Sequence, residues 1–318
     1  MTSNLLERLL QGEQRALSIA ITMIERMQPG VSDLMSQIDR YTGNAYTIGI
    51  TGPPGAGKST VVTELTKLIR GLDKKVGIIA VDPTSPFSGG AILGDRIRMQ
   101  SHHTDSEVFI RSVATRGQSG GLSRVVKTLV RLFDGSGKDI IIVETVGVGQ
   151  TEVSIMGAAD SILVTLVPES GDVVQTLKAG LMEIADLYLV NKSDRSGAGQ
   201  LAASITNTIQ LSSPMPAWIP PVIMTQANTG KGLDEVWENI ENHRRFLIQN
   251  SELTIRRSAR RKGEYLETVE EEMGRRLRSA VENDSHISEA LKNIEAGAQD
   301  PYSAAIKLIN TTENNFHL

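Results

Sequence analysis

One short stretch constrains this chain more than any other. Residues 52–60 read GPPGAGKST and follow a β-branched and aromatic run at residues 46–51. A strand, a glycine-rich loop and a helix in this order form a phosphate loop, because the glycines let successive backbone N–H groups point at phosphate oxygens beside the positive end of the helix. Lys58 would reach the outer phosphates, and the Ser59 hydroxyl would bind Mg²⁺. The predicted nucleotide contacts are Gly52, Pro53, Pro54, Gly55, Ala56, Gly57, Lys58, Ser59 and Thr60.

The composition excludes several other classes of protein. A chain of 318 residues has room for an α/β domain with helical additions. The formal net charge of −4 gives no electrostatic footprint for nucleic acid or for an acidic membrane surface. Cysteine is absent, which excludes disulfides, thiolate metal sites and cysteine nucleophiles. No apolar run approaches the roughly 18 residues that cross a bilayer, and charges interrupt the N-terminal segment, so we expect a cytoplasmic protein without a membrane partner.

Helices are expected ahead of the phosphate loop. Apolar residues recur at helical spacing from Leu5 to Met27, with Gly12 interrupting the pattern and Pro29-Gly30 stopping it. We interpret this segment as one or two helices that form a packing layer on the nucleotide domain.

Two apolar runs predict buried parallel strands that end in carboxylates. Residues 76–81 end at Asp82, and residues 140–143 end at Glu144. Ligands of open α/β sheets bind at the carboxyl ends of the strands. Glu144 is therefore expected to hold Mg²⁺, directly or through water, while the N–H of Gly147 senses the γ-phosphate. Asp82 would lie beside the phosphates if its strand neighbours the first one.

A polar loop at residues 83–98 follows the second strand. Its composition suits a segment that is ordered by γ-phosphate and Mg²⁺. His102 and His103 come just after it. They allow a metal site or a solvated helix end, and the second reading is favoured because no third ligand lies nearby in the sequence.

The base is predicted from the run Asn191-Lys192-Ser193-Asp194, which directly follows an apolar strand at residues 187–190. The Asp194 carboxylate can accept two hydrogen bonds, from N1–H and from the exocyclic amine of guanine. Adenine has an unprotonated N1 and no amine at that position. Asn191 and the stem of Lys192 would brace the loop and the ring. The predicted nucleotide is GTP rather than ATP.

Two further contacts with the nucleotide or its attacking water are indicated less strongly by the sequence. The turn Gln226-Ala227-Asn228 follows the last predicted strand, where a backbone N–H would meet the guanine carbonyl oxygen. Val148, not glutamine, follows Gly147, so Gln150 is the nearest candidate to orient the attacking water.

The C-terminal part differs in composition. From about Ser251 onward, blocks of basic and acidic residues alternate, which is typical of a long exposed helix. Its apolar stripe needs a surface to cover it, and we favour a homodimer contact over a solvated face. The stripe consists of Leu266, Val269, Met273 and Leu277.

Taken together, these motifs resemble the MeaB family of GTPases, which escort adenosylcobalamin-dependent acyl-CoA mutases. The resemblance covers nearly the whole chain. It rests on Asp82, Asp95, residues 143–150 and 170–187, and on the two ends, Ala20-Ile21-Thr22 and Asp300-Pro301-Tyr302. It implies an α/β fold, a P-loop GTPase with a mostly parallel central sheet flanked by helices. The implied division is an N-terminal helical extension (1–44), a GTPase domain (45–249) and a C-terminal helical dimerisation arm (250–318).

The resemblance also implies roles for individual residues. The loops after Asp82 and Gly147 would be the first two switches, and residues 168–182 a third, in which Lys178 couples to the mutase. Where the family usually has a serine before the base-contacting alanine, this chain has Gln226, so that contact depends on the backbone. Magnesium would be surrounded by Ser59, Asp82, Asp95 and Glu144, and hydrolysis would involve Lys58, Asp95, Glu144 and Gln150.

The expected function is that of a G-protein chaperone. GTP binding and hydrolysis would gate adenosylcobalamin loading or release and protect or reactivate a mutase. The client would be methylmalonyl-CoA mutase or a 2-hydroxyisobutyryl-, isobutyryl- or ethylmalonyl-CoA relative. A nickel-type metal-delivery GTPase is one alternative, although such proteins carry cysteine or histidine clusters and this chain has no cysteine and five scattered histidines. The other is a transport-protein kinase, which needs a second substrate pocket and a base.

Overall fold

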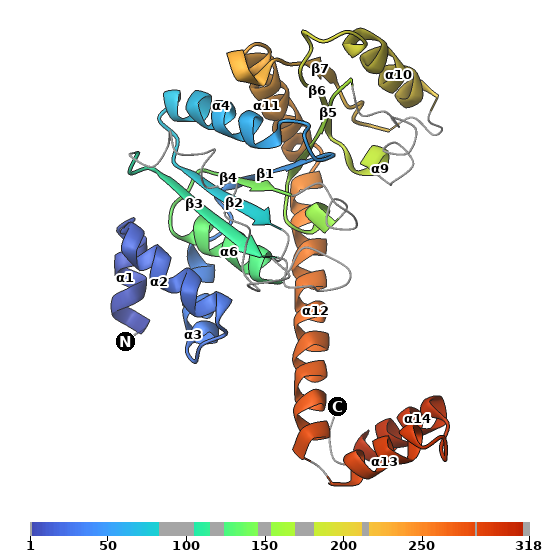
Figure 1. The fold of residues 1–318 in the computed structure, drawn as a ribbon. Helices are drawn as coiled ribbons and strands as arrows, with labels where there is room; N and C mark the ends of the chain where they lie inside the picture. The colour runs from blue at the N-terminus through green and yellow to red at the C-terminus, as the bar shows by residue number, and fades with distance from the viewer. Residues whose placement is uncertain are drawn as a thin grey trace. The chain divides into compact units, whose positions relative to one another are not determined.

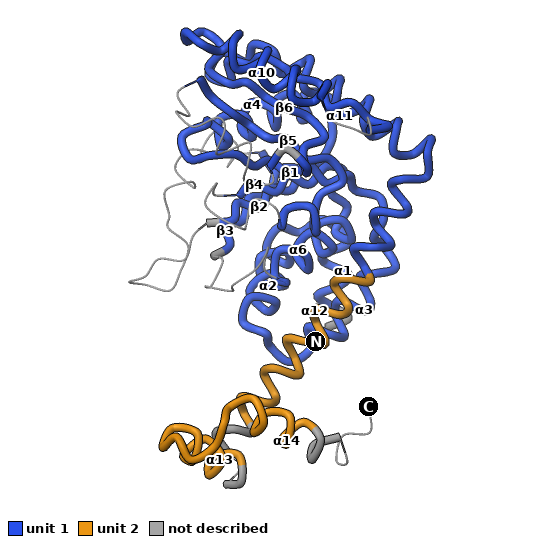
Figure 2. Tube along the Cα trace, turned by 90° about the vertical axis from the view of Figure 1, so that its right-hand side faces the viewer, with its two compact units in different colours: residues 1–261 blue, residues 262–318 orange. Residues whose placement is uncertain are grey.

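The computed structural model describes residues 2–82, 105–114, 124–145, 154–168, 181–211, 216–283 and 285–313. It consists of two compact units, residues 1–261 and residues 262–318, which Figure 2 shows in blue and orange. The first unit holds the central sheet and the nucleotide motifs. The described part of the second unit consists of helices and the short turn at residues 296–300 that joins two of them.

A seven-stranded sheet lies at the centre of the first unit (Figure 1), and every pair of neighbouring strands is parallel. The strands are β1 (Tyr46–Thr51), β2 (Val76–Asp82), β3 (Val108–Ala114), β4 (Ile140–Glu144), β5 (Ser161–Leu166), β6 (Leu187–Val190) and β7 (Val222–Met224). Their order is β3-β2-β4-β1-β5-β6-β7. The predicted α/β fold with a parallel sheet is confirmed.

The strand order answers one question that the sequence left conditional. β2 does not neighbour β1, because β4 lies between them, with Ile142 in register with Ile48 on one side and Ile78 on the other. All residues of β4 are buried, as expected for the most apolar strand in a sheet covered on both faces. Glu144 is therefore next to Ile50 of β1, whereas Asp82 ends a strand two places away.

One face of the sheet is covered by α4 (Lys58–Gly71) and α11 (Leu233–Gln249) (Figure 1). Their apolar residues share a buried cluster with alternate residues of the strands, such as Ile48, Ile78 and Ile142. Side chains on a strand alternate between the two faces, so the intervening residues point to the opposite side of the sheet.

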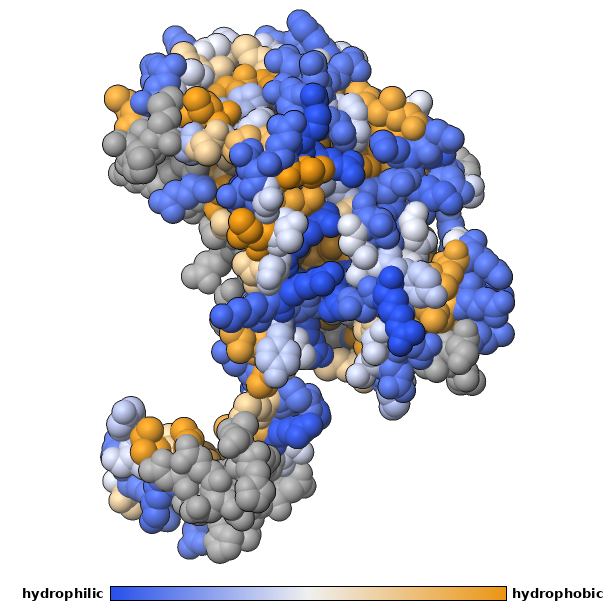
Figure 3. Space-filling view, turned by 180° about the vertical axis from the view of Figure 1, so that it is seen from behind, coloured by the Kyte–Doolittle hydropathy of each residue, from blue (hydrophilic) through white to orange (hydrophobic). Residues whose placement is uncertain are grey.

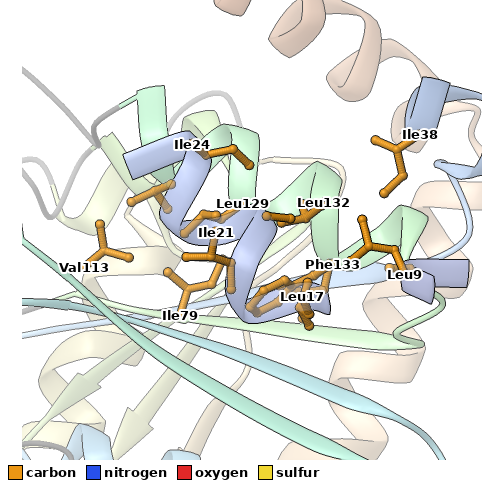
Figure 4. Packing of buried hydrophobic residues seen from close by; sticks show 14 of the residues in the cluster. Leu9, Leu17, Ile21, Ile24, Ile38, Ile79, Val113, Leu129, Leu132 and Phe133 are labelled. Atoms are coloured by element: carbon orange, nitrogen blue, oxygen red, sulfur yellow. The ribbon is translucent and has the colours of Figure 1, made fainter. Parts of the chain in front are cut away.

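The opposite face has two groups of helices. Over β2 and β4 lie α1 (Thr2–Leu10), α2 (Gln14–Glu25), α3 (Val31–Ile38), the short η1 (Asp39–Tyr41) and α6 (Arg124–Gly135). Over β5 and β6 lie η3 (Ile155–Gly157), α9 (Met182–Ile184) and α10 (Ala198–Gln210). Figure 4 shows Leu17, Ile21 and Ile24 of α2 packed beside Leu129 and Leu132 of α6. The predicted packing layer of N-terminal helices is confirmed.

The N-terminal layer contains one helix more than expected. Pro29-Gly30 ends the predicted pattern, but α3 starts immediately afterwards at Val31. Gly30 has a φ of 93°, a left-handed conformation that glycine adopts without strain. The chain thereby turns and returns Leu34 and Ile38 to the same core.

The C-terminal helices are α12 (Glu252–Asn283), α13 (Ser285–Glu295) and α14 (Pro301–Glu313). The predicted long charged helix is α12. In the second unit, the side chains of its stripe are half exposed, with exposed fractions of 48, 37, 45 and 50% for Leu266, Val269, Met273 and Leu277. Figure 3 shows apolar surface on this unit. Among the described residues, no helix combines the length and the apolar character that crossing a membrane requires.

Candidate functional site

The phosphate loop occupies residues 52–57, between the end of β1 and the start of α4. Gly52, Gly55 and Gly57 all have positive φ values of 136, 77 and 86°. At Gly52 a Cβ atom would lie 2.0 Å from the backbone oxygen of Thr165 in β5. The loop is therefore pressed against the neighbouring strand, and only glycine fits at its first position.

Lys58 is the first residue of α4 and is buried against its own loop. Its Nζ donates hydrogen bonds to the carbonyl oxygens of Gly52 at 2.8 Å and Pro53 at 3.0 Å. These bonds hold the ammonium group over the loop. The backbone N–H groups at the start of α4 and the positive helix end add to its attraction for an anion.

Ser59 and Glu144 are brought together from α4 and β4. The Ser59 hydroxyl donates to Glu144 Oε1 at 2.7 Å, and both side chains are more than nine-tenths buried. A hydroxyl and a carboxylate are the hard oxygen donors that Mg²⁺ prefers. Among the described residues, no group of three His, Cys, Asp or Glu side chains could hold a metal ion. The pair fits a magnesium ion that takes its other ligands from phosphate and water, as is usual for this ion.

Asn191 connects the phosphate loop to the loop at residues 191–194, which the sequence predicts to recognise the base. Its Nδ2 donates to the carbonyl oxygen of Ala56 at 2.9 Å, so Asn191 braces the phosphate loop. Its Oδ1 accepts hydrogen bonds from Ala227 N at 3.1 Å and from Thr225 Oγ1 at 3.3 Å. Three loops thus meet at one buried amide.

In the loop at residues 191–194, Asp194 is exposed and Lys192 is half-buried. Lys192 has a φ of 56°, and the next N–H, from Ser193, donates to the carbonyl oxygen of Thr225 at 3.0 Å. The backbone is therefore fixed while the Asp194 carboxylate is accessible to a base.

Thr225 supports the Asn191 loop, a contact that sequence reasoning missed. Thr225 is fully buried, and it holds the Asn191 loop through its hydroxyl and through its backbone. A side chain one residue before Gln226 therefore supports the loop. The only sequence signal for this role was a threonine at the end of an apolar strand. Threonine is common in strands, so its presence there did not indicate a special role. The N–H of Ala227, predicted to meet guanine, is taken up by Asn191 in this structure.

Several predicted site residues lie outside the described part of the chain. These are Asp95, Gly147, Gln150 and Lys178, together with residues 169–180 of the third predicted switch and the pair His102 and His103. Asp82 is placed at the end of β2. Pro54 lies in the phosphate loop, Thr60 in the first turn of α4, and Asn228 in the short η5 (Ala227–Thr229).

The comparisons with known proteins agree with this arrangement. The family model described as methylmalonyl-CoA mutase-associated GTPase MeaB matches residues 17–282. A protein of Pyrococcus horikoshii named as a GTPase is 45% identical over 304 residues, which are 95% of this chain and 95% of that protein. The mouse protein named methylmalonic aciduria type A homolog, mitochondrial, is 30% identical over 319 residues, covering 95% of this chain and 77% of that protein.

One solved structure is similar over almost the entire chain. It is named LAO/AO transport system kinase and superposes with a TM-score of 0.74 at 26% identity, covering 98% of this chain and 97% of the other. The carboxyl ends of β1, β4 and β6 thus carry the phosphate loop, the buried carboxylate of Glu144 and the Asn191 loop. This chain is a GTPase that belongs to the MeaB family.

Proposed function

We propose that this GTPase is a chaperone of an adenosylcobalamin-dependent acyl-CoA mutase. Its nucleotide state would gate cofactor loading or release and protect or reactivate the mutase. The observation that carries the proposal is the family match over residues 17–282, to a family described by its association with methylmalonyl-CoA mutase. The name of the mouse relative supports it. The client is methylmalonyl-CoA mutase or a 2-hydroxyisobutyryl-, isobutyryl- or ethylmalonyl-CoA relative.

In this proposal the described residues bind and orient GTP. Lys58 and the N–H groups of the phosphate loop bind the phosphates, Asp194 selects guanine, and Asn191 holds the two loops together. Bound Mg²⁺ would neutralise the charge that develops on the γ-phosphate. The proposed ligands are Ser59 and Glu144, joined by Asp82 and Asp95. Gln150 would orient the water, Gly147 would sense the γ-phosphate, and the turn Gln226-Ala227-Asn228 would face the guanine carbonyl.

A direct test follows the lifetime of a mutase during turnover. Each candidate mutase is assayed with adenosylcobalamin, alone and with this protein in the presence of GTP or GDP. We expect a longer active lifetime for one mutase, dependent on which nucleotide is bound. Lys178→Ala, in the proposed third switch, should keep GTP binding and lose the protection. An unchanged lifetime with every mutase would overturn the proposal.

We also propose that the arm at residues 250–318 forms a homodimer. The apolar stripe of α12 is half exposed, and an unpaired stripe of this kind is more stable when covered. Leu266→Glu combined with Met273→Glu should convert a dimer to a monomer in light scattering. Ser279→Glu, which adds a charge to α12 away from the stripe, should leave the dimer intact. A monomeric wild type would exclude this arrangement.

A kinase is the second candidate, favoured only by the name of the similar solved structure. The two functions differ in where the γ-phosphate goes. With labelled GTP, the chaperone releases phosphate to water, whereas a kinase transfers it to a protein. Nickel delivery finds no support among the described residues, which contain no cluster of metal-binding side chains.

A further inference from the structure

The two loops that the sequence predicts to contact the base follow the last two strands of the sheet. Residues 191–194 follow β6, which has four residues, and the turn at residues 226–228 comes after β7, which has three. β7 is also the last strand in the order of the sheet, so it has a neighbouring strand on one side. So short an edge strand makes few ladder hydrogen bonds. The placement of both base loops therefore depends on what holds the amino ends of these strands.

Trp218 joins the amino ends of β6 and β7. Its indole Nε1 donates to the carbonyl oxygen of Asp186 at 2.8 Å. Asp186 directly precedes β6, and Trp218 lies in the segment that leads into β7. At the carboxyl ends, the N–H of Thr225 donates to the carbonyl oxygen of Val190 at 2.9 Å. The two strands are thus bonded to each other at both ends.

Asp186 is itself fixed by its neighbours. Its carboxylate Oδ2 accepts from the N–H of Ile162 in β5 at 2.9 Å, and its own N–H donates to the carbonyl oxygen of Ile162 at 2.9 Å. Arg256 Nη1 donates to Oδ1 at 3.2 Å. β5 in turn lies against the phosphate loop at Gly52. The carbonyl that receives the Trp218 bond is therefore fixed to the strand that supports the phosphate loop.

The indole ring lies against a histidine whose orientation is also fixed. The ring centroids of Trp218 and His243 are 4.8 Å apart, and His243 is fully buried. Its Nδ1 lies 2.7 Å from Ser161 Oγ, which lies 2.6 Å from the hydroxyl of Tyr46. Its Nε2 lies 3.2 Å from Asp186 Oδ1, without hydrogen-bond geometry. Because both ring nitrogens face polar atoms of the core, the imidazole presents a fixed surface to Trp218.

Packing alone does not explain a tryptophan at this position. Trp218 is half-buried, and its ring centroid lies 5.3 Å from that of Phe246. Phenylalanine would pack against the same two rings and has no N–H that needs a partner. What tryptophan adds is the donor to a backbone carbonyl at the start of β6.

We propose that Trp218 is a positioning residue for guanine recognition, and that its bond to Asp186 sets the separation of the two base loops. Trp218 acts through β6 and β7 from their amino ends, away from the nucleotide. The inference rests on the proposed selection of guanine by Asp194. It does not depend on which partner the protein serves.

The test compares GDP with inosine diphosphate in Trp218→Phe. Inosine diphosphate keeps N1–H but lacks the exocyclic amine, so the ratio of the two affinities reports the contact of that amine with Asp194. We expect this ratio to fall about three- to tenfold, the size of one net hydrogen bond. KM for GTP should rise by a similar factor, while kcat at saturating GTP stays the same because Glu144 and the phosphate loop keep their own supports. Inorganic tripolyphosphate, which has no base, should compete for the site equally well in both proteins.

Two controls separate the hydrogen bond from packing. Trp237→Phe makes the same chemical change on α11, where the ring packs against the core, and should leave the affinity ratio unchanged. Benzothienylalanine at position 218 keeps the shape of tryptophan with sulfur in place of the N–H, and it should reproduce the loss. It carries the test if Trp218→Phe does not fold. A lower melting temperature with an unchanged affinity ratio would overturn the inference.

Asp194→Asn serves as the reference for the base site. If that variant kept its preference for guanine, the assignment of the base site would fail, and this inference with it. If Asp194→Asn lost the preference while both replacements of Trp218 kept the wild-type ratio, only the role of Trp218 would be refuted.

Discussion

The Asp160 carboxylate at the start of β5 accepts two hydrogen bonds from Arg257 near the start of α12, at 3.1 Å from Nε to Oδ1 and 2.6 Å from Nη2 to Oδ2. Arg260 bonds the same carboxylate, and the N–H of Thr47 donates to it at 3.0 Å. Asp160 is fully buried. This cluster links the first turns of α12 to the amino ends of β1 and β5. The nucleotide motifs lie at the other, carboxyl ends of the strands.

Removing the Asp160 charge should strongly destabilise the protein. In Asp160→Asn, two arginines would remain at a buried site without their carboxylate, so we expect a loss of about 3 kcal/mol in the free energy of unfolding. Urea denaturation at pH 7 measures it. Glu238→Gln, an exposed carboxylate on α11, is the matched control and should change the free energy by less than about 0.5 kcal/mol. A similar stability for both variants would contradict this role.

The same carboxylate predicts a pH dependence. Burial raises the pKa of Asp160, but the hydrogen bond from Arg257 and the charges of Arg260 and Arg257 outweigh it, so the pKa lies below its usual value. In acid the unfolded chain therefore binds more protons than the folded chain, and the stability that Asp160 contributes at neutral pH is lost below about pH 4. The difference in unfolding free energy between the wild type and Asp160→Asn should shrink from pH 7 to pH 3. A constant difference would show that the charge is not responsible.

Gly52→Ala should abolish tight nucleotide binding. The alanine would need a φ of 136° and would place its Cβ against the backbone of Thr165, which cannot move without shifting β5. We expect the dissociation constant for GDP to rise by at least about tenfold, equivalent to roughly 1.4 kcal/mol, in titration calorimetry. Gly71→Ala lies at the end of α4 with open space around it, so it should bind GDP normally. Normal binding by the Gly52 variant would refute the loop geometry.

Asp194→Asn should change the preferred base from guanine to xanthine. The asparagine amide would face the guanine amine with a donor, whereas it can donate to the carbonyl that xanthine carries at the same position. We expect GDP binding to weaken on the order of 100-fold and xanthosine diphosphate binding to improve. Competition against a fluorescent nucleotide measures both. Asp234→Asn, at an exposed aspartate of α11, should retain guanine preference.

The sequence predicted the parts of the site that are local in the chain. The phosphate loop, Glu144 and the Asn191 loop each follow an apolar run, and their order in the chain indicates that they meet at the carboxyl ends of the strands. The order of the strands, with β4 between β1 and β2, could not be predicted from local sequence patterns, because it depends on how the crossover helices pack.

Contacts between distant residues were also missed. Asp160 and Arg257 are 97 positions apart, and Thr51 and Thr145, whose hydroxyl groups are hydrogen-bonded, are 94 apart. Each of these residues has an ordinary local explanation: a threonine suits a strand, and an arginine suits a charged helix. Only the folded chain shows that their polar groups are partners.

The proposed chaperone function is tested most directly by the rate of GTP hydrolysis of the purified protein, measured with and without each candidate cobalamin-dependent mutase. Hydrolysis should be slow for the protein alone and faster with one mutase, and the Lys178→Ala variant should lose the acceleration while retaining the basal rate. GTP that is bound tightly but hydrolysed at the same rate with every mutase would contradict the proposed chaperone function.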